Sequence, residues 1–130
     1  MKIRNCFQQT QIEFIKLNNY MPKKPPIALI TGGGTGIGFS IAKKLHSLKY
    51  QVVITGRREK KLIEAKKKLG TKCHIFENDI SVVNSIPAMI DNIEKKIGNI
   101  EILINNAGQH LRKVALKTTD EEWQNVINTN

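Results

Sequence analysis

The chain has 130 residues and a formal net charge of +10 at pH 7, and it contains two cysteines and three histidines. This length suits one domain with its own core. The cysteines are too few for a disulfide framework, and the scattered histidines predict no metal site. No apolar run approaches the roughly 20 residues that cross a membrane, and no secretory signal is visible. We therefore expect a cytoplasmic protein without a membrane partner.

The positive charge makes nucleic acid a candidate partner, so a basic polyanion-binding protein is one alternative function. Many of the lysines lie in the runs Lys60–Lys61 and Lys66–Lys68, which alternate with Leu62, Ala65 and Leu69. This spacing is typical of a solvated helix face, and no nucleic-acid motif accompanies it. We therefore expect no nucleic-acid partner.

Residues 1–25 carry little periodic pattern and end in a proline-rich run, which cannot form regular structure. We expect this N-terminal extension to be poorly ordered. Met21 stands shortly before the first apolar segment, so residues 1–20 are either an extension or the product of a start codon assigned too early.

Short apolar segments alternate with amphipathic segments from residue 27 onward. The first amphipathic segment carries Ile37, Ile41, Leu45 and Leu48 at helical spacing, and we expect this stripe to face a sheet. Pro87 lies early in the third helix and is expected to bend it or delay its start. The sequence predicts strands at 27–30, 51–55, 72–77 and 100–104, and helices at 36–48, 58–69, 82–97 and from the capping box at Thr119 onward.

This alternation predicts an α/β fold, a Rossmann-like doubly wound parallel sheet with helices on both faces. By the doubly wound rule, the strands take the order 3-2-1-4 and a ligand binds at their carboxyl ends. Compared with a complete fold of this kind, the chain stops after the fourth strand and the start of the fourth helix. We therefore expect residues 26–130 to form an incomplete NAD(P)-binding domain.

A glycine-rich turn joins the first strand to the first helix. It lets main-chain N–H groups approach a ligand, and the helix N-terminus favours a pyrophosphate. An ordinary tight turn is the alternative, but the strand before it and the helix after it favour nucleotide binding. The spacing is not G-x-G-x-x-G, because Phe39 stands where the last glycine would be. The candidate cofactor-binding residues in this turn are Gly32, Gly34, Thr35, Gly36, Ile37 and Gly38.

The end of the second predicted strand indicates which dinucleotide is preferred. Many dinucleotide sites carry a carboxylate there that binds the ribose 2′-hydroxyl. Here Gly56 is followed by Arg57 and Arg58. Guanidinium groups bind phosphate in a bidentate way, so the sequence favours NADP(H) over NAD(H). The alternative is that both arginines are solvated residues at the start of a helix.

Four motifs together resemble the short-chain dehydrogenase/reductase family from about residue 27 to residue 130. They are Thr31-Gly32-x-x-x-Gly36-Ile37-Gly38, Asp79-Ile80, Asn105-Asn106-Ala107-Gly108 and Trp123-x-x-Val126-x-x-x-Asn130. The resemblance implies hydride transfer between a nicotinamide and the carbon of a small carbonyl or alcohol substrate. It also implies that Asp79 and Ile80 contact the adenine, that Asn106, Ala107 and Gly108 line the cofactor, and that Asn130 belongs to the catalytic tetrad.

The chain departs from the family at the segments that would carry the catalytic Ser and the Tyr-x-x-x-Lys pair. Tyr20 and Lys24 have the right spacing, but Pro22 lies between them and the pair precedes the first strand. We expect Asn130, at the end of a fraying helix, to hold no fixed place and to supply no proton.

The leading interpretation is the cofactor-binding half of an NADP(H)-dependent oxidoreductase, inactive by itself and without most of the helices that the family uses for oligomerisation. The alternatives are a non-catalytic nucleotide-binding remnant or gene fragment and, less favoured, the polyanion-binding protein.

Overall fold

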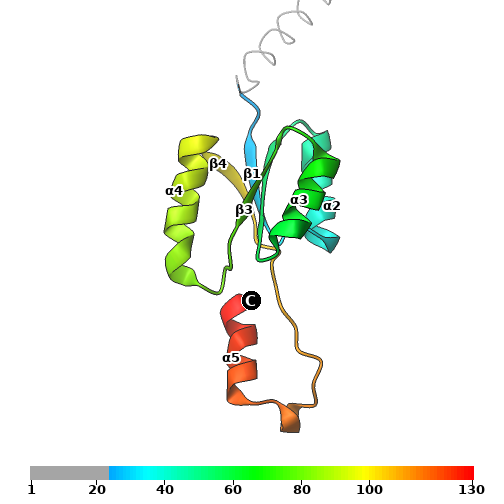
Figure 1. Cartoon of the computed structure of the whole chain (residues 1–130), viewed down its shortest axis with the longest axis vertical. Coiled ribbons are helices and arrows are strands. Elements are labelled where there is room, and N and C mark those ends of the chain that lie inside the picture. Colours follow the sequence, from blue (N-terminus) through cyan, green and yellow to red (C-terminus); the bar gives the residue numbers. More distant parts are fainter. Residues whose placement is uncertain (1–23) are drawn as a thin grey trace, which may run out of the picture.

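The structure is a computed structural model that describes residues 24–130 (Figure 1). Four strands form one parallel sheet in the order β3-β2-β1-β4, which confirms the predicted order. The expected extension at residues 1–25 lies almost entirely outside the described residues. The strands are β1 (Ile27–Thr31), β2 (Gln51–Gly56), β3 (Cys73–Glu77) and β4 (Ile100–Ile104), and the α-helices are α2 (Gly36–Ser47), α3 (Glu59–Leu69), α4 (Ile86–Lys96) and α5 (Asp120–Thr129).

Strand β1 lies at the centre of the sheet, and all five of its residues are buried. A run of apolar residues suits this place because helices cover both faces of a parallel sheet. In the register, Ile30 is opposite Ile54 of β2 on one side and Ile104 of β4 on the other. All four strands therefore end along the same edge of the sheet.

Helices α2 and α3 cover one face of the sheet and α4 covers the other (Figure 1). On the first face, Ala28 and Ile30 of β1 and Ile54 of β2 pack with Ala42 of α2 and Leu62 of α3. On the second face, the core is formed by Ile27, Leu29, Val53, Met89 and Ile93. Alternate residues of β1 thus contribute to two cores, as the two-residue period of a strand requires.

Two expectations about the helices were only partly right. In α2, Ile41 and Leu45 pack against the core as expected, but Ile37 is 76% exposed and Leu48 is also exposed, so these two do not face the sheet. The buried residues of the helix are Gly38 and Ala42. The predicted third helix does not begin at Val82, because a short 3-10 turn at Val83–Ser85 precedes α4. Pro87 then occupies the first turn of α4, which confirms that it delays the start of the helix.

Residues 109–130 extend from the end of β4 and include the 3-10 turn η2 (Ala115–Lys117) and α5, which lies beyond the end of the sheet (Figure 1). We call this segment the arm and residues 24–108 the body. No residue of the arm is buried. No helix within residues 24–130 is both long and apolar enough to cross a membrane.

Candidate functional site

A cleft of about 850 Å³ lies where β1, β2 and β4 end, and it is open to solvent. The turns that follow all four strands contribute to its lining, as expected for the carboxyl edge of a doubly wound sheet. The lining brings together every residue that the sequence assigned to the cofactor: Gly32, Gly34, Thr35, Gly36, Ile37, Gly38, Arg57, Arg58, Asp79, Ile80, Asn106, Ala107 and Gly108.

The glycine-rich turn has a shape that side chains would obstruct. Gly32 and Gly36 have φ angles of +66° and +56°, in the left-handed region that favours glycine. A Cβ atom on Gly38 would collide with the side-chain amide of Asn106 and with the carbonyl oxygen of Gly32. A Cβ on Gly36 would meet no protein atom within 4 Å. The turn is therefore closely packed against the protein at Gly38 and open toward the cleft at Gly36.

Thr31 ties the end of β1 to the turn after β4. Its Oγ1 accepts hydrogen bonds from the backbone N–H groups of Asn106 and Ala107, both at 3.0 Å, and donates to the carbonyl of Ile104 at 3.4 Å. The side-chain amide of Asn106 donates to the carbonyl of Thr31 at 2.9 Å. These contacts hold the turn after β4 against the glycine-rich turn, and so they fix the floor of the cleft.

The two arginines after β2 stand at the other end of the cleft. Nη1 of Arg57 lies 3.9 Å from Oδ2 of Asp79, and Nη2 of Arg58 donates a long hydrogen bond of 3.5 Å to Oγ1 of Thr35. Gly56 occupies the last position of β2, where a ribose-binding carboxylate would stand. Both guanidinium groups are solvent-exposed and only weakly engaged, so they are available to an anion that enters the cleft.

Asp79 is held by its own turn rather than by Arg57. Its Oδ1 accepts hydrogen bonds from the hydroxyl and the backbone N–H of Ser81, at 2.8 and 3.0 Å. These two bonds, and secondarily the charge of Arg57, lower the pKa of Asp79 below its ordinary value. The carboxylate therefore stays ionised at neutral pH, and its contact with Arg57 is a long ion pair of 3.9 Å.

Part of the cleft lining was not predicted from the sequence. The missed residues are Thr55, Gly56, Lys61, Leu62, Asn78, His110 and Thr129. Among residues 24–130, the hydroxyl of Thr55 and the side-chain oxygen of Asn78 are buried polar atoms without a hydrogen-bond partner. Both follow or end a predicted strand, and that position is the signal that could have identified them. Unpartnered polar atoms in the wall of a cleft are suited to bind a polar ligand.

Asn130 lies outside the lining of this cleft, although Thr129 belongs to it. The Asn130 side chain accepts a hydrogen bond from the backbone N–H of Gln109 at 2.8 Å and donates one to its carbonyl at 2.9 Å. The sequence predicted no fixed place for Asn130, whereas in the structure both ends of its amide bind the backbone of Gln109, which follows the Asn-Asn-Ala-Gly turn. Asn130 also lines a second hollow of about 620 Å³ between this segment and α5.

The histidines and cysteines of the described chain form no metal site: within residues 24–130, no group of three or more His, Cys, Asp or Glu side chains could hold a metal ion. His74 shares a hydrogen bond of 3.2 Å with the side chain of Gln51. Cys73 is fully buried in the core, and burial raises the pKa of its thiol to about 11. Neither residue lines the cleft.

Comparison with protein families shows what this architecture is. A family model described as short chain dehydrogenase matches residues 26–130. The chain belongs to the short-chain dehydrogenase family.

Known relatives resemble this chain in both sequence and fold. An uncharacterized oxidoreductase of Staphylococcus epidermidis is 34% identical over 82% of this chain and 46% of its own length. A protein named NADP-dependent 3-hydroxy acid dehydrogenase from Escherichia coli K12 is 35% identical over 80% of this chain and 42% of its own length. The crystal structure of a short chain dehydrogenase from Bacillus anthracis matches with a TM-score of 0.76 and 34% identity over 80% of this chain and 44% of that one. The chain thus spans less than half the length of these relatives.

Family membership implies a NAD(P) dinucleotide cofactor, and the cleft residues fit one. The open space at Gly36 admits a phosphate to the N-terminus of α2, where the N-cap residue Thr35 makes no side-chain cap. The unpartnered Thr55 and Asn78 oxygens offer acceptors in the cleft wall, and Arg57 and Arg58 offer positive charge.

Proposed function

We propose that this chain is the cofactor-binding part of an oxidoreductase that uses NADP(H) in preference to NAD(H). The observation that carries the proposal is the pair Arg57 and Arg58 on the wall of the cleft, next to Gly56 at the end of β2. A carboxylate at that position would repel a 2′-phosphate, whereas guanidinium groups bind it with charge-assisted hydrogen bonds. The E. coli relative that is named NADP-dependent supports the same preference.

The cofactor would be held from three sides. The N-terminus of α2, with Gly36 and Ile37 in its first turn, would face the pyrophosphate, because the free N–H groups and the helix dipole favour negative charge there. Asp79 and Ile80 would contact the adenine. Asn106, Ala107 and Gly108 would line the path toward the nicotinamide.

The proposed reaction is hydride transfer between the dinucleotide, which supplies or accepts the hydride when bound, and a small carbonyl or alcohol substrate. Asn130 is the residue of this chain that we place nearest to the chemistry. Its two hydrogen bonds with Gln109 fix the C-terminal end of α5 beside the turn after β4. We propose that Asn130 contributes by holding this position, because an amide does not titrate near neutral pH and so is no general acid.

The test measures the dissociation constants of NADPH and NADH for the purified chain by calorimetry. Arg57→Ala should weaken the binding of NADPH about tenfold or more, since a hydrogen bond to a charged group typically contributes about 1.5–3 kcal/mol. NADH binding should change less than about twofold. Arg112→Ala is the matched control, because Arg112 is a guanidinium of the arm outside the cleft lining. Equal losses for both cofactors in Arg57→Ala would contradict the proposal.

A further inference from the structure

Lys61 occupies a different environment from the neighbouring lysines of α3. It lines the cleft together with Arg57 and Arg58, and its side chain is 45% exposed, whereas Lys60 is outside the lining. Arg57 and Arg58 precede α3, which begins at Glu59, and Lys61 lies in the first turn of that helix. The lining of the cleft thus brings together three cations from the end of β2 and the start of α3.

The first turn of α3 packs directly against the glycine-rich turn. A Cβ atom on Gly34 would lie 3.3 Å from the Leu62 side chain and 3.4 Å from the backbone carbonyl carbon of Lys61. Next to this contact lies a further, smaller hollow of about 250 Å³, lined by Lys61 and Glu64 among others. Lys61 thus lines two cavities, the cleft on one side and this hollow on the other.

In the structure, Lys61 is engaged by an acidic residue that is not part of the cleft lining. Its Nζ donates a hydrogen bond of 2.8 Å to Oε2 of Glu64, one turn further along α3. This contact lowers the pKa of Glu64 below its ordinary value. Both side chains are about half exposed, and an ion pair in such a place is weak, so a stronger anion in the cleft can displace the carboxylate.

We infer that Lys61 is a third ligand of the ribose 2′-phosphate and that Glu64 competes with the phosphate for it. The inference rests on the proposed function, because it assigns a further residue to the same phosphate site. A phosphate monoester carries a charge of about −1.5 to −2 at pH 7 and outcompetes a single carboxylate for an ammonium group. Glu64 therefore sets how tightly the site binds a 2′-phosphate, and Lys61 leaves its ion pair when the phosphate binds.

The experiment uses the whole chain with two probes that differ only in the phosphate concerned, 2′,5′-ADP and 5′-AMP, titrated at low ionic strength. Lys61→Gln should weaken the binding of 2′,5′-ADP about three- to tenfold and change the binding of 5′-AMP by less than about twofold. Lys60→Gln removes the same charge one position away and should change neither probe by more than about twofold.

A second pair of variants tests the competition. Glu64→Gln should tighten 2′,5′-ADP about two- to threefold by releasing Lys61. The same substitution in the Lys61→Gln background should give no gain, because the residue that Glu64 engages is absent. Tightening of equal size in both backgrounds would show a general charge effect and would overturn the inference. Thermal melting of each variant establishes that the fold is retained.

The outcomes separate this inference from the proposed function. If Arg57→Ala leaves the preference for 2′,5′-ADP unchanged, the 2′-phosphate site itself is wrongly placed and both proposals fall. If Arg57→Ala removes the preference while Lys61→Gln behaves like Lys60→Gln, the site stands and the role of Lys61 is overturned.

Discussion

The body and the arm are stabilised by different interactions. The body has two buried cores, one on each face of the sheet, and its central strand β1 is buried throughout. The arm buries no residue and exposes large apolar side chains, with Leu116 98% and Trp123 65% exposed. Burial therefore stabilises the body, whereas the arm depends on local polar contacts.

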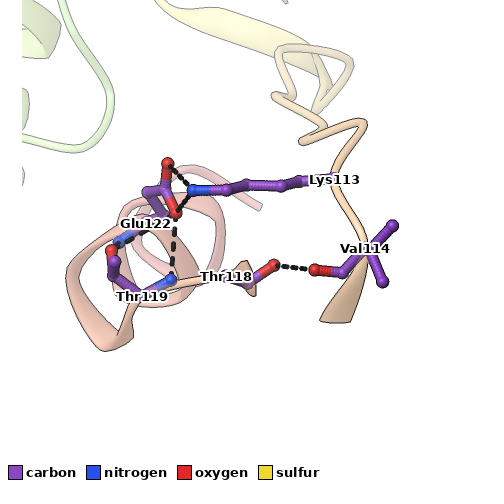
Figure 2. A network of polar contacts seen from close by, with 5 residues as sticks. All are labelled: Lys113, Val114, Thr118, Thr119 and Glu122. Carbon is purple, nitrogen blue, oxygen red and sulfur yellow. Dashed lines mark hydrogen bonds and ion pairs between the residues drawn. The ribbon is translucent and has the colours of Figure 1, made fainter. Parts of the chain in front are cut away.

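Those polar contacts gather at the start of α5 (Figure 2). Thr119 and Glu122 form a reciprocal capping box, and the ammonium of Lys113 binds both carboxylate oxygens of Glu122. At the other end of the helix, Asn130 binds the backbone of Gln109. A helix of ten residues is marginal in water on its own. Local contacts can thus define the shape of the arm, but they give it little resistance to opening.

The largest expected effect comes from a core deletion in the body. Ile54 of β2 is fully buried between the sheet and helices α2 and α3. Ile54→Ala should lower the free energy of unfolding by about 2–5 kcal/mol, through lost transfer free energy and the cavity left behind. Urea denaturation followed by far-UV circular dichroism measures this change.

The matched substitution in the arm is Ile127→Ala. Ile127 is 55% exposed on α5, so the same change of side chain should alter the free energy of unfolding of the body by no more than about 0.5 kcal/mol. If Ile127→Ala destabilised the body as much as Ile54→Ala does, the division of the chain into two regions would be wrong.

An intermediate loss of stability is expected at Thr31, which holds the turn after β4 against the glycine-rich turn. Thr31→Val removes the acceptor of the Asn106 and Ala107 N–H groups while it preserves the volume of the side chain. We expect a loss of about 1–3 kcal/mol, since unpaired donors in a partly buried place keep their desolvation cost. Thr118→Val, which removes an exposed hydroxyl of the arm, should change the same denaturation curve very little.

The smallest effect is confined to the arm and depends on pH. Hydrogen bonding to Lys113, followed by the backbone N–H of Thr119, lowers the pKa of Glu122. Because the folded arm favours the carboxylate, this contribution is present above the ordinary Glu pKa and is lost as the pH falls through the lowered value. Acidification should therefore loosen α5 before the body unfolds.

Trp123 reports this loosening, because it is the single tryptophan of the chain and lies on α5. Its fluorescence should change on acidification ahead of the body's circular dichroism signal. Glu122→Gln should remove the early fluorescence transition. A single transition shared by both signals in the unmodified chain would show that the arm and body open together.

The same contrast explains what the sequence could predict. The strand positions and their order could be predicted from β-branched runs that alternate with amphipathic segments. The capping box at Thr119 could be predicted because its two partners are only three residues apart, and the structure confirms it. Ile37 was misassigned because helical periodicity marks an apolar stripe without saying whether a sheet or an open cleft faces it.

The missed cleft residues share one cause. Thr55 and Asn78 end or follow their strands as ordinary polar residues, and Lys61 is one lysine among many in α3. Their positions in the cleft depend on which strands become neighbours in space. Local pattern does not record that information. For Thr55 and Asn78 the only signal in the sequence is their position at the end of a predicted strand, and Lys61 becomes recognisable only when the sheet is assembled.

The pairing of β1 with β4 has a kinetic consequence. Thr31 and Ala107, which meet at the floor of the cleft, are 76 positions apart in the chain. Contacts of such long range form late, because the loop-closure entropy must be overcome before they contribute. During synthesis β1, β2 and β3 emerge before β4, and until β4 docks one side of β1 is an unpaired edge that invites aggregation. We therefore expect the cleft to form only after β4 has docked against β1, later than the contacts among β1, β2 and β3.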